Sequence, residues 1–428
     1  MPGKQKIVVL GAGFGGMRAA ILLSKDIQKY GLLNKYEVVL VDRNDYQTYT
    51  PTLYEVATTA KEMANYLDLK EIVTIPVQKI IGDYPVTFLK RSVEGLDLLN
   101  GLIHFSDGPA VNFDYLLLAL GAETNYFGIP GLKENSLPLK TFLDAILMRD
   151  RIMELFSSQE SARIVIGGGG PTGVELAGEL QGWLCRLEAK NKKCSSQITI
   201  VDASPDILWG LHPKVVKPVK KRLRALGVET IVNDPIAVAD KNNVLLKSGL
   251  RVPFDLLIWT GGVKASSLIG NMPMKLTKRG QAEVAGRMEC LPQTPDLKLY
   301  GKIYGIGDAV CFYDPLTGKP VPGLARTALT QARIAAHNIM ESIRLKEGLT
   351  NKPRYAYYQP LDFSYVIPVG GKWAAAKVGS LVITGFLGWL LKILVELNYL
   401  MELLPFWMAL KNWFKSVRVI VKNDRTLL

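Results

Sequence analysis

The chain has 428 residues, of which 48% are hydrophobic and 21% charged, with a formal net charge of +13 and a mean hydropathy of +0.13. This length exceeds a single domain of about 100–200 residues, and the composition excludes both a disordered chain and a multi-span membrane protein. The basic surplus favours anionic partners such as dinucleotides or anionic lipid, and no motif for nucleic acid accompanies it.

Cysteine and histidine residues are few and scattered. No C-x-x-C pair is present, so we expect reduced thiols rather than a disulfide framework. No His/Cys cluster has the spacing of metal ligands, and we therefore predict no metal site. The residues concerned are Cys185, Cys194, Cys290, Cys311, His104, His212 and His337.

A buried strand is predicted over residues 6–10, and because it lies so close to the first residue we expect no signal peptide. A glycine turn, an amphipathic helix and a second strand (36–41) ending at Asp42 complete a β-α-β unit. Strands of a small meander are predicted over 80–89 and 102–105. The apolar run 115–120 then reads as a strand that ends at Gly121.

The same order of elements returns further along the chain. A strand (163–166), a glycine-rich loop, a helix over about 174–190 and a strand (197–201) form a second β-α-β unit. A helix rich in Lys and Arg (about 213–226), strands near 228–232 and 243–247, and an apolar strand (256–260) follow. Such an internal duplication predicts two dinucleotide sites in one chain.

Beyond residue 290 the pattern changes. A strand closes at Tyr304-Gly305-Ile306-Gly307-Asp308-Ala309, and a helix with many small residues is predicted over about 327–345. Residues 350–428 differ again in composition and hold four of the seven tryptophans, namely Trp373, Trp389, Trp407 and Trp413.

Gly11, Gly13 and Gly16 form G-x-G-x-x-G between a strand and a helix. The first glycine permits the tight turn, the second lets a pyrophosphate approach the backbone, and the third lets helix and strand pack closely. Asp42, at the end of the next strand, is placed to bind ribose hydroxyls. The alternative is a simple turn, against which the strand, the helix and the acid all argue together.

The second fingerprint consists of Gly168, Gly170 and Gly173, and Asp202 ends the strand that follows. A carboxylate at this position favours NADH, because it would repel the 2′-phosphate of NADPH. No Arg or Lys directly follows Asp202, which argues the same way.

The late pair Gly307-Asp308 is suited to hold the ribityl and phosphate region of a long cofactor such as FAD. Its alternative interpretation is a strand-end turn. Together with the two fingerprints it favours the first site for FAD and the second for NADH.

At this point the chain resembles the two-dinucleotide-domain flavoproteins, and within them type II NADH dehydrogenase, the non-pumping NADH:quinone oxidoreductase. The resemblance covers residues 5 to 345. The stretches that carry it are YTPTLYEVAT (49–58), LLLALGAETNYFGIPG (116–131), PLKTFLDAILMRDRI (138–152), GGGPTGVELAGEL (168–180), TGGVKAS (260–266) and YGIGDA (304–309).

The resemblance implies an α/β fold with two Rossmann-like dinucleotide-binding domains and a C-terminal amphipathic, membrane-binding helical region. The expected boundaries are 1–125 and 286–348 for the FAD domain, 126–285 for the NADH domain and 349–428 for a membrane-anchoring or dimerisation region.

It also implies which residues contact the cofactors. The FAD contacts would be Gly11, Gly13, Gly15, Gly16, Asp42, Arg43, Thr50, Pro51, Gly121 and Asp308, with Thr50 and Pro51 near the isoalloxazine ring. The NADH contacts would be Gly168, Gly170, Gly173, Glu175, Asp202 and Gly261. Glu175 would be the catalytic residue, organising the hydride site or handling a proton. The alternative for Glu175 is a carboxylate that complements the helix dipole.

One motif departs from the family. Its quinone motif, Ala-Gln-x-Ala-x-Gln followed by another polar residue, corresponds here to Ala325–Gln331, so that Arg326 and Thr330 replace the two glutamines and Gln331 alone keeps an amide. A guanidinium can hydrogen-bond a quinone carbonyl, so Arg326, Thr330 and Gln331 are the candidate quinone contacts. The alternative is a helix without a ligand.

Residues 378–410 are strongly apolar, but the uncharged stretch 378–391 falls short of the roughly 20 residues needed to span a bilayer. Lys392, Glu396 and Glu402 fall within about one third of the helix circumference. Pro405 should break or bend the helix. Trp407 and Trp413 then precede a basic end made up of Lys411, Lys415, Arg418, Lys422 and Arg425, with one acid, Asp424.

This combination predicts a segment that lies in the headgroup layer, and hence a peripheral protein on the cytoplasmic face of the cell membrane. A dimer interface or a core helix is the alternative, and a homodimer is compatible with both interpretations.

The sequence therefore predicts an FAD-dependent NADH:quinone oxidoreductase that does not pump protons. Rival functions are a ferredoxin or rubredoxin reductase, a sulfide:quinone reductase, and a non-catalytic NADH-binding redox sensor.

Overall fold

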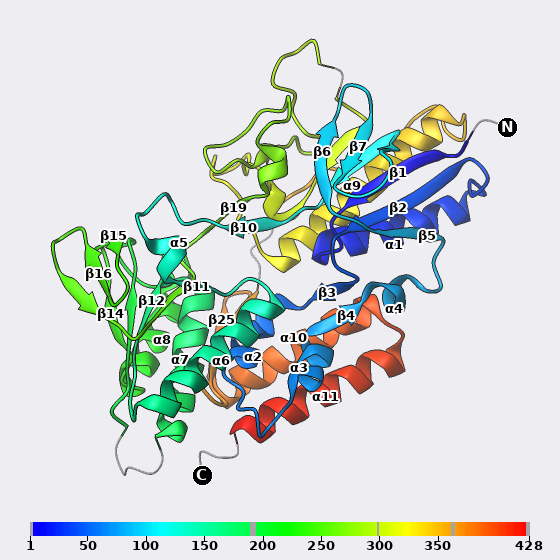
Figure 1. Ribbon diagram of the computed structural model, residues 1–428. Coiled ribbons are helices and arrows are strands. Elements are labelled where there is room, and N and C mark those ends of the chain that lie inside the picture. Colours follow the sequence, from blue (N-terminus) through cyan, green and yellow to red (C-terminus); the bar gives the residue numbers. More distant parts are fainter. Residues whose placement is uncertain (1–2, 189–193, 298, 361–363, 425–428) are drawn as a thin grey trace. The chain divides into compact units, whose positions relative to one another are not determined.

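The computed structural model describes residues 3–188, 194–297, 299–360 and 364–424 (Figure 1). It divides into two compact units. The first comprises 1–47, 75–123 and 263–361, and the second comprises 48–74, 124–262 and 362–428. Each unit is thus assembled from three separate pieces of chain.

The first unit contains strands β1 (Gln5–Leu10), β2 (Tyr36–Asp42), β5 (Val86–Lys90), β6 (Val93–Asp97), β7 (Leu102–Phe105), β8 (Val111–Asn112), β9 (Tyr115–Leu118), β20 (Ala282–Glu283), β21 (Ile303–Gly305) and β22 (Val310–Cys311), and helices α1 (Phe14–Lys29), α4 (Val77–Ile81) and α9 (Ala325–Lys346). Its main sheet has the order β21-β9-β1-β2-β5, and all neighbours run parallel. Helices α1 and α9 pack side by side (Figure 1), and α1 covers β1, β2 and β5.

The second unit contains helices α2 (Leu53–Ala57), α3 (Tyr66–Val73), α5 (Leu132–Asn135), α6 (Phe142–Ser158), α7 (Pro171–Leu187), α8 (Pro213–Ala225), α10 (Phe386–Leu403) and α11 (Phe406–Asp424), and strands β11 (Leu137–Pro138), β12 (Arg163–Gly167), β13 (Gln197–Val201), β14 (Glu229–Ile231), β15 (Ile236–Ala239), β16 (Asn243–Leu246), β17 (Arg251–Pro253), β18 (Leu256–Trp259), β23 (Tyr365–Pro368), β24 (Ala374–Val378) and β25 (Leu381–Gly385). Strands β3 (Tyr46–Thr48), β4 (Thr74–Pro76), β10 (Ala122–Thr124) and β19 (Val263–Ala265) lie where the chain passes from one unit to the other.

The main sheet of the second unit repeats the design of the first. Its order is β11-β18-β12-β13-β14, again parallel throughout. Each unit adds a three-stranded antiparallel meander, β6-β7-β8 in the first and β15-β16-β17 in the second. The strands nearest the centre of each sheet are continuous apolar runs, as expected for strands buried on both faces. The duplication predicted from the sequence is therefore confirmed.

The two units also carry an aspartate at an equivalent position, where it makes the same hydrogen bond. Asp114 precedes β9 and accepts the N–H of Lys6 at 2.8 Å, while Asp255 precedes β18 and accepts the N–H of Arg163 at 2.7 Å. In each case the carboxylate fixes the start of the third strand against the first strand of the β-α-β unit.

One predicted strand is shorter than the sequence suggested. Residues 77–81 form α4, and only 86–90 form a strand. The apolar pair Ile80 and Ile81 is buried by a short helix instead, and Gly82 ends that helix before the strand begins. Lys190, the expected end of α7, lies outside the described residues.

The expectation that all thiols are reduced was wrong for one pair. Cys185 and Cys194 form a disulfide with their Cα atoms 4.9 Å apart. The last turn of α7 carries Cys185, and the segment leading into β13 carries Cys194, so the return of the chain to the sheet brings together two residues that share no C-x-x-C spacing. Cys290 and Cys311 are free and buried.

The C-terminal part consists of an antiparallel sheet, β23-β24-β25, followed by α10 and α11. The helix break predicted at Pro405 is present between α10 and α11. None of the helices that the structure describes is both long and apolar enough to cross a membrane. Arg425 lies beyond the described residues.

The polar stripe of α10 faces inward. Glu396 is buried and the side chain of Lys392 is only 10% exposed, whereas a row of apolar side chains on the same helix is exposed: Phe386, Leu387, Leu390, Leu394, Val395 and Met401. On α11, Trp407 is 76% exposed, but Trp413 donates its indole N–H to the carbonyl of Ile393 at 2.9 Å. Of the two tryptophans expected at a lipid surface, Trp413 therefore acts as a packing residue.

Candidate dinucleotide-binding sites

The first glycine loop joins β1 to α1. At Gly11 the backbone has φ +105°, and a Cβ atom there would lie 2.3 Å from the carbonyl oxygen of Ala119. A Cβ atom at Gly16 would lie 1.8 Å from the carbonyl oxygen of Gly11, so both positions require glycine for close packing. A Cβ atom at Gly13, the N-cap of α1, would meet nothing within 4 Å. The space above Gly13 is therefore open at a helix N-terminus, where a pyrophosphate fits.

Asp42 closes this loop from the end of β2. Its Oδ2 accepts the N–H of Ala12 at 2.7 Å, and its Oδ1 accepts the N–H of Asn44 at 2.8 Å. Each oxygen retains a lone pair for a ribose hydroxyl. The neighbouring Arg43 is exposed.

Gly15 packs against the region of the late Gly-Asp pair. A Cβ atom there would lie 2.8 Å from Cδ1 of Ile306 and 3.2 Å from the carbonyl oxygen of Ala328. The N–H of Gly307 is donated to Oε1 of Gln331 at 2.7 Å. Within the first unit, the fold thus brings the glycine loop, the Gly307-Asp308 turn and the start of α9 together.

Gln331 is only 2% exposed, and its carbonyl oxygen is engaged by Gly307. Thr330 donates its hydroxyl to the carbonyl of Arg326 at 2.9 Å, one turn back on α9, and Arg326 is exposed. Of the three candidate quinone contacts, Gln331 positions the Gly307 turn, and Arg326 presents the most accessible polar group.

The second glycine loop joins β12 to α7 and matches the first. Gly168 has φ +112°, and a Cβ atom there would lie 2.4 Å from Cα of Gly261. A Cβ atom at Gly173 would lie 1.9 Å from the carbonyl oxygen of Gly168, whereas one at Gly170 would meet nothing within 4 Å. Gly261 is thus needed for the close approach of two backbones, and Gly170 leaves room for a phosphate.

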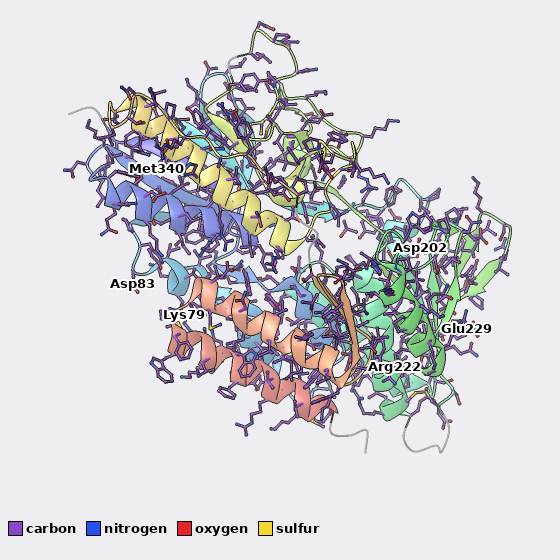
Figure 2. All side chains as sticks on the ribbon, turned by 180° about the vertical axis from the view of Figure 1, so that it is seen from behind. Lys79, Asp83, Asp202, Arg222, Glu229 and Met340 are labelled. Atoms are coloured by element: carbon purple, nitrogen blue, oxygen red, sulfur yellow. A yellow bond between two sulfur atoms is a disulfide. The ribbon has the colours of Figure 1, made fainter. Side chains whose placement is uncertain are left out.

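Asp202 repeats the role of Asp42. Its Oδ2 accepts the N–H of Gly169, and its Oδ1 accepts the N–H of Ser204 at 2.6 Å. The carboxylate lies at the end of β13, where Figure 2 labels it. Both sites therefore carry a negative charge where a ribose would bind.

Glu175 occupies the first turns of α7, close behind the second glycine loop. Burial raises the pKa of Glu175 well above its usual range, and the charge of Glu55 reinforces this rise while Lys392 opposes it. The raised pKa favours the protonated form of Glu175 more than that of a surface glutamate, and the protonated form is the one that can donate a proton.

Glu175 belongs to a buried cluster of ionisable groups in the second unit. Lys392 of α10 bonds Oε1 of Glu55 at 2.6 Å, and Tyr54 donates its hydroxyl to the same oxygen at 3.2 Å. Glu396, one turn after Lys392, is 2% exposed. Among the described residues, Oε2 of Glu55 and Oε2 of Glu396 have no hydrogen-bond partner.

The charges in this cluster are interdependent. Burial raises the pKa of Glu396, against the pull of Lys392. Burial lowers the pKa of Lys392, but Glu55 and Glu396 outweigh it and hold that pKa above its usual value. Burial also raises the pKa of Tyr49 well above its usual range, reinforced by Glu396, Glu55 and Glu175. A change in the charge of one group therefore changes the pKa of the others.

Thr50 and Pro51 immediately follow Tyr49 in a single 3₁₀ turn and are exposed. They belong to the second unit, as do Glu55 and Glu175, whereas Gly121 belongs to the first.

Sequence inspection missed Glu55, Lys392 and Glu396 as members of one cluster. The charged residues of the otherwise apolar 378–410 segment pointed to Lys392 and Glu396, but nothing in that segment indicated Glu55. It missed Gln281 as well, which donates its amide to the carbonyls of Asp308 and Val310 at 3.2 and 3.1 Å and so fixes the turn from the other side. Within the described ranges, no three His, Cys, Asp or Glu side chains gather as metal ligands would.

A family model described as pyridine nucleotide-disulphide oxidoreductase matches residues 5–332. Because the match spans most of the chain, the protein belongs to this family.

Individual relatives and solved structures are similar to this chain over most of its length. The chain is 26% identical over 427 residues to the type II NADH:quinone oxidoreductase Ndh of Mycobacterium tuberculosis, covering 93% of this chain and 85% of that protein. Its fold matches the structure of NDH2 from Plasmodium falciparum in complex with NADH with a TM-score of 0.80, at 16% identity and 99% coverage of both chains. It also matches the sulfide:quinone oxidoreductase from Aquifex aeolicus with a TM-score of 0.74, at 19% identity over 95% of this chain and 92% of that one.

Proposed function

We propose that this protein is an FAD-dependent NADH:quinone oxidoreductase, in which a hydride passes from NADH to FAD and two electrons then pass to a membrane quinone, without proton pumping. The observation that carries the proposal is the pair of glycine loops with the same geometry, each open at the helix N-cap and each closed by an aspartate. The name and extent of the curated relative from Mycobacterium tuberculosis support the choice of quinone as acceptor.

We assign FAD to the first unit and NADH to the second. The Gly307-Asp308 turn, held by Gln331 and Gln281, lies with the first loop and suits the longer cofactor. Asp202 suits NADH, because its carboxylate can accept from ribose hydroxyls and would repel a 2′-phosphate. The bound flavin would supply the redox chemistry, and the protein supplies binding and orientation.

In this proposal the chain's own residues bind, orient and protonate. The free N–H groups at the N-termini of α1 and α7 bind the pyrophosphates. Glu175 is the proposed catalytic group, since its raised pKa keeps a proton available near the nicotinamide site. Lys392 and Glu55 act on that pKa in opposite directions, because the charge of Lys392 lowers it and the charge of Glu55 raises it.

We further propose that the exposed apolar side of α10 and α11 attaches the protein to the cytoplasmic surface of a membrane. The outward residues of α10, together with Phe406 and Trp407, form a row of large exposed apolar side chains beside the basic residues of α11. Apolar groups flanked by cations are typical of helices that lie in the headgroup layer. A homodimer is compatible with this attachment, and sedimentation of the purified protein would test it.

A sulfide:quinone reductase would require a reactive thiol. Cys290 and Cys311 are buried, and burial raises the pKa of both thiols. A protonated, inaccessible thiol is a poor nucleophile, which argues against sulfide as the electron donor.

The proposal predicts that the purified, flavin-loaded protein oxidises NADH in the presence of a naphthoquinone or benzoquinone and prefers NADH to NADPH. Asp202→Ala should reduce this preference by about tenfold or more, since a hydrogen bond to a charged group contributes about 1.5–3 kcal/mol. The measurement is kcat/KM for both nucleotides. Asp42→Ala, in the equivalent position of the first loop, should lower flavin content and leave the NADH-to-NADPH ratio unchanged.

Turnover with ferredoxin but with no quinone would contradict the proposal, as would bound FAD with no turnover at all.

A further inference from the structure

Helix α8 concentrates positive charge beyond what its packing requires. Its thirteen residues include six Lys and Arg residues and no acid. Val215, Val219 and Leu223 form its buried face, so the cations lie on the remaining faces. Arg222, which Figure 2 labels, belongs to this helix. Its guanidinium donates hydrogen bonds to the carbonyls of Val369 and Gly370.

A cavity of about 820 Å³ lies between α8 and the segment 206–211 that precedes it. Its lining combines two chemical types. The apolar part includes Trp209, Leu211 and Val216, and the cationic part consists of Lys217, Lys220, Lys221 and Arg224.

The cavity carries an excess of positive charge. Its one lining acid is Asp206, and both carboxylate oxygens of Asp206 are 2.8 Å from Nζ of Lys220. Lys217, Lys221 and Arg224 follow at spacings of four and three residues and therefore share one side of the helix. In the part of the chain that the structure describes, no acid pairs with these three cations.

The apolar wall is held in place by a strained turn. Leu208 has φ +51°, is 1% exposed and donates its N–H to the carbonyl of Gly169 at 2.7 Å. A left-handed conformation is unfavourable for a leucine. This turn buries Leu208 and leaves the next residue, Trp209, 66% exposed at the cavity.

Helix α8, which forms one wall of the cavity, also contacts the C-terminal sheet of the same unit. Helix α8 packs against β24 and β25, and β25 leads directly into α10. Val378 and Leu381, at the turn between these two strands, are exposed.

We propose that this cavity binds one anionic phospholipid. Lys217, Lys221 and Arg224 hold its phosphate, and its apolar part lies against Trp209 and Val216. Cations suited to a phosphate, an exposed tryptophan and an apolar part of the lining fit a lipid better than a fully polar anion. The site is separate from the proposed electron transfer, because it needs neither nicotinamide nor quinone.

The test uses dihexanoyl phosphatidic acid below its critical micelle concentration, so that binding does not depend on attachment to a bilayer. Calorimetric titration of the flavin-loaded protein should show saturable binding of one lipid. Lys217→Glu with Lys221→Glu should weaken it by about tenfold or more, because two charge-assisted contacts become repulsive. Lys217→Gln with Lys221→Gln should weaken the binding less, because it removes the two charges without reversing them. This second variant keeps the test valid if the Glu variant does not fold.

A matched control is available on the same helix. Lys214 lies on α8 but does not line the cavity, and Lys247 is an exposed lysine elsewhere in the unit. Lys214→Glu with Lys247→Glu makes the same change in net charge and should leave the affinity unchanged. Trp209→Phe should reduce the change in tryptophan fluorescence on titration.

Three results would overturn the proposal. One is equal affinity for inorganic phosphate or AMP, which would make the cavity a site for small anions or nucleotides. Another is loss of lipid binding in saturating NADH, which would assign the cavity to the nucleotide site. The third is equal weakening by the two Glu double variants, which would reduce the effect to net charge. Turnover with quinone is not part of the readout, so failure here leaves the proposed function standing.

Discussion

Glu175 shows how a single side chain links stability to the proposed chemistry. Its folded pKa is raised, so the folded state favours the protonated form. Stability from this effect is fully present below the unfolded glutamate pKa of about 4.3 and is lost as pH rises through the raised folded pKa. The acid thus makes the second unit less stable as the solution becomes more alkaline.

Glu175→Gln should remove this part of the pH dependence, because glutamine cannot ionise. The free energy of unfolding of the variant, measured with urea at a series of pH values, should shift upward relative to the wild type as pH rises from about 5 to about 9. Parallel curves for the two proteins would contradict the assignment.

Glu347 provides a control of opposite sign. Lys35, with help from Tyr36, lowers the pKa of Glu347, so its contribution is present above the unfolded value and is lost as pH falls through the lowered one. Glu347→Gln should therefore differ from the wild type mainly at neutral pH and converge with it in acid.

At the scale of elements, each glycine loop contains one glycine that the fold requires and another that leaves space for a ligand. A Cβ atom at Gly16 would collide with the carbonyl of Gly11, while one at Gly13 would enter open space. Substitution at the two positions should therefore have different consequences, although both glycines belong to the same fingerprint.

Gly13→Ala should fold with near-native secondary structure and lose most of its FAD, because the methyl group occupies the space for the pyrophosphate. Gly16→Ala should fail to fold or yield little soluble protein. Flavin absorbance per folded chain and circular dichroism measure the two effects. Gly170→Ala, the equivalent change in the second loop, should retain FAD and raise KM for NADH, and equal loss of flavin in both loop variants would refute the assignment of cofactors.

An ion pair between Lys392 and Glu55, with both side chains largely buried, joins helix α10 to α2. Lys392→Met should lower the free energy of unfolding by about 3–5 kcal/mol, because it removes the cation that pairs with the largely buried carboxylate of Glu55. Adding Glu55→Gln should restore part of this loss. Urea unfolding measures both variants, and Lys411→Met, on an exposed position of α11, should have little effect. Equal losses in the single and double variants would show that packing, rather than charge, dominates.

Both glycine loops, their aspartates and the duplicated sheets could be predicted from the sequence, because strand, loop and helix signals lie within about thirty residues of one another. The inward side of α10 could not, because helical periodicity groups Lys392 with Glu396 but does not say which side meets the core. The hydrogen bond from Gly307 to Gln331 depends on where α9 packs against the Gly307 turn, and the disulfide depends on how the chain turns back within the nine residues from Cys185 to Cys194. Neither arrangement follows from the local pattern of residue types.

On the scale of the whole molecule, the exposed apolar side of α10 and α11 is the proposed route to the lipid surface. Phe406→Ser with Trp407→Ser should weaken binding to anionic vesicles by about tenfold or more, since burial of one large apolar side chain contributes about 1.5–3 kcal/mol. Vesicle flotation measures this. Leu316→Ser, at an even more exposed site in the first unit, should have no effect, and unchanged flotation of the double variant would remove this surface from the proposal.

The C-terminal part of the chain contributes to the hydrophobic core of the second unit. Ile367, Val369 and Ala375 belong to the same core as Ile164 of β12 and Leu176 of α7. Gly178 of α7 meets the turn at Gly370 so closely that a Cβ atom on Gly178 would lie 2.8 Å from the backbone nitrogen of Gly370.

A truncated form made for detergent-free crystallisation, by deleting everything after residue 363, would therefore strip away the support beneath α7. It would remove Lys392, the cation that pairs with Glu55. The deletion would therefore damage the nucleotide pocket as well as remove the apolar C-terminal helices. Solubility is better sought by replacing outward-facing side chains of α10 and α11 one at a time, with the helices left in place.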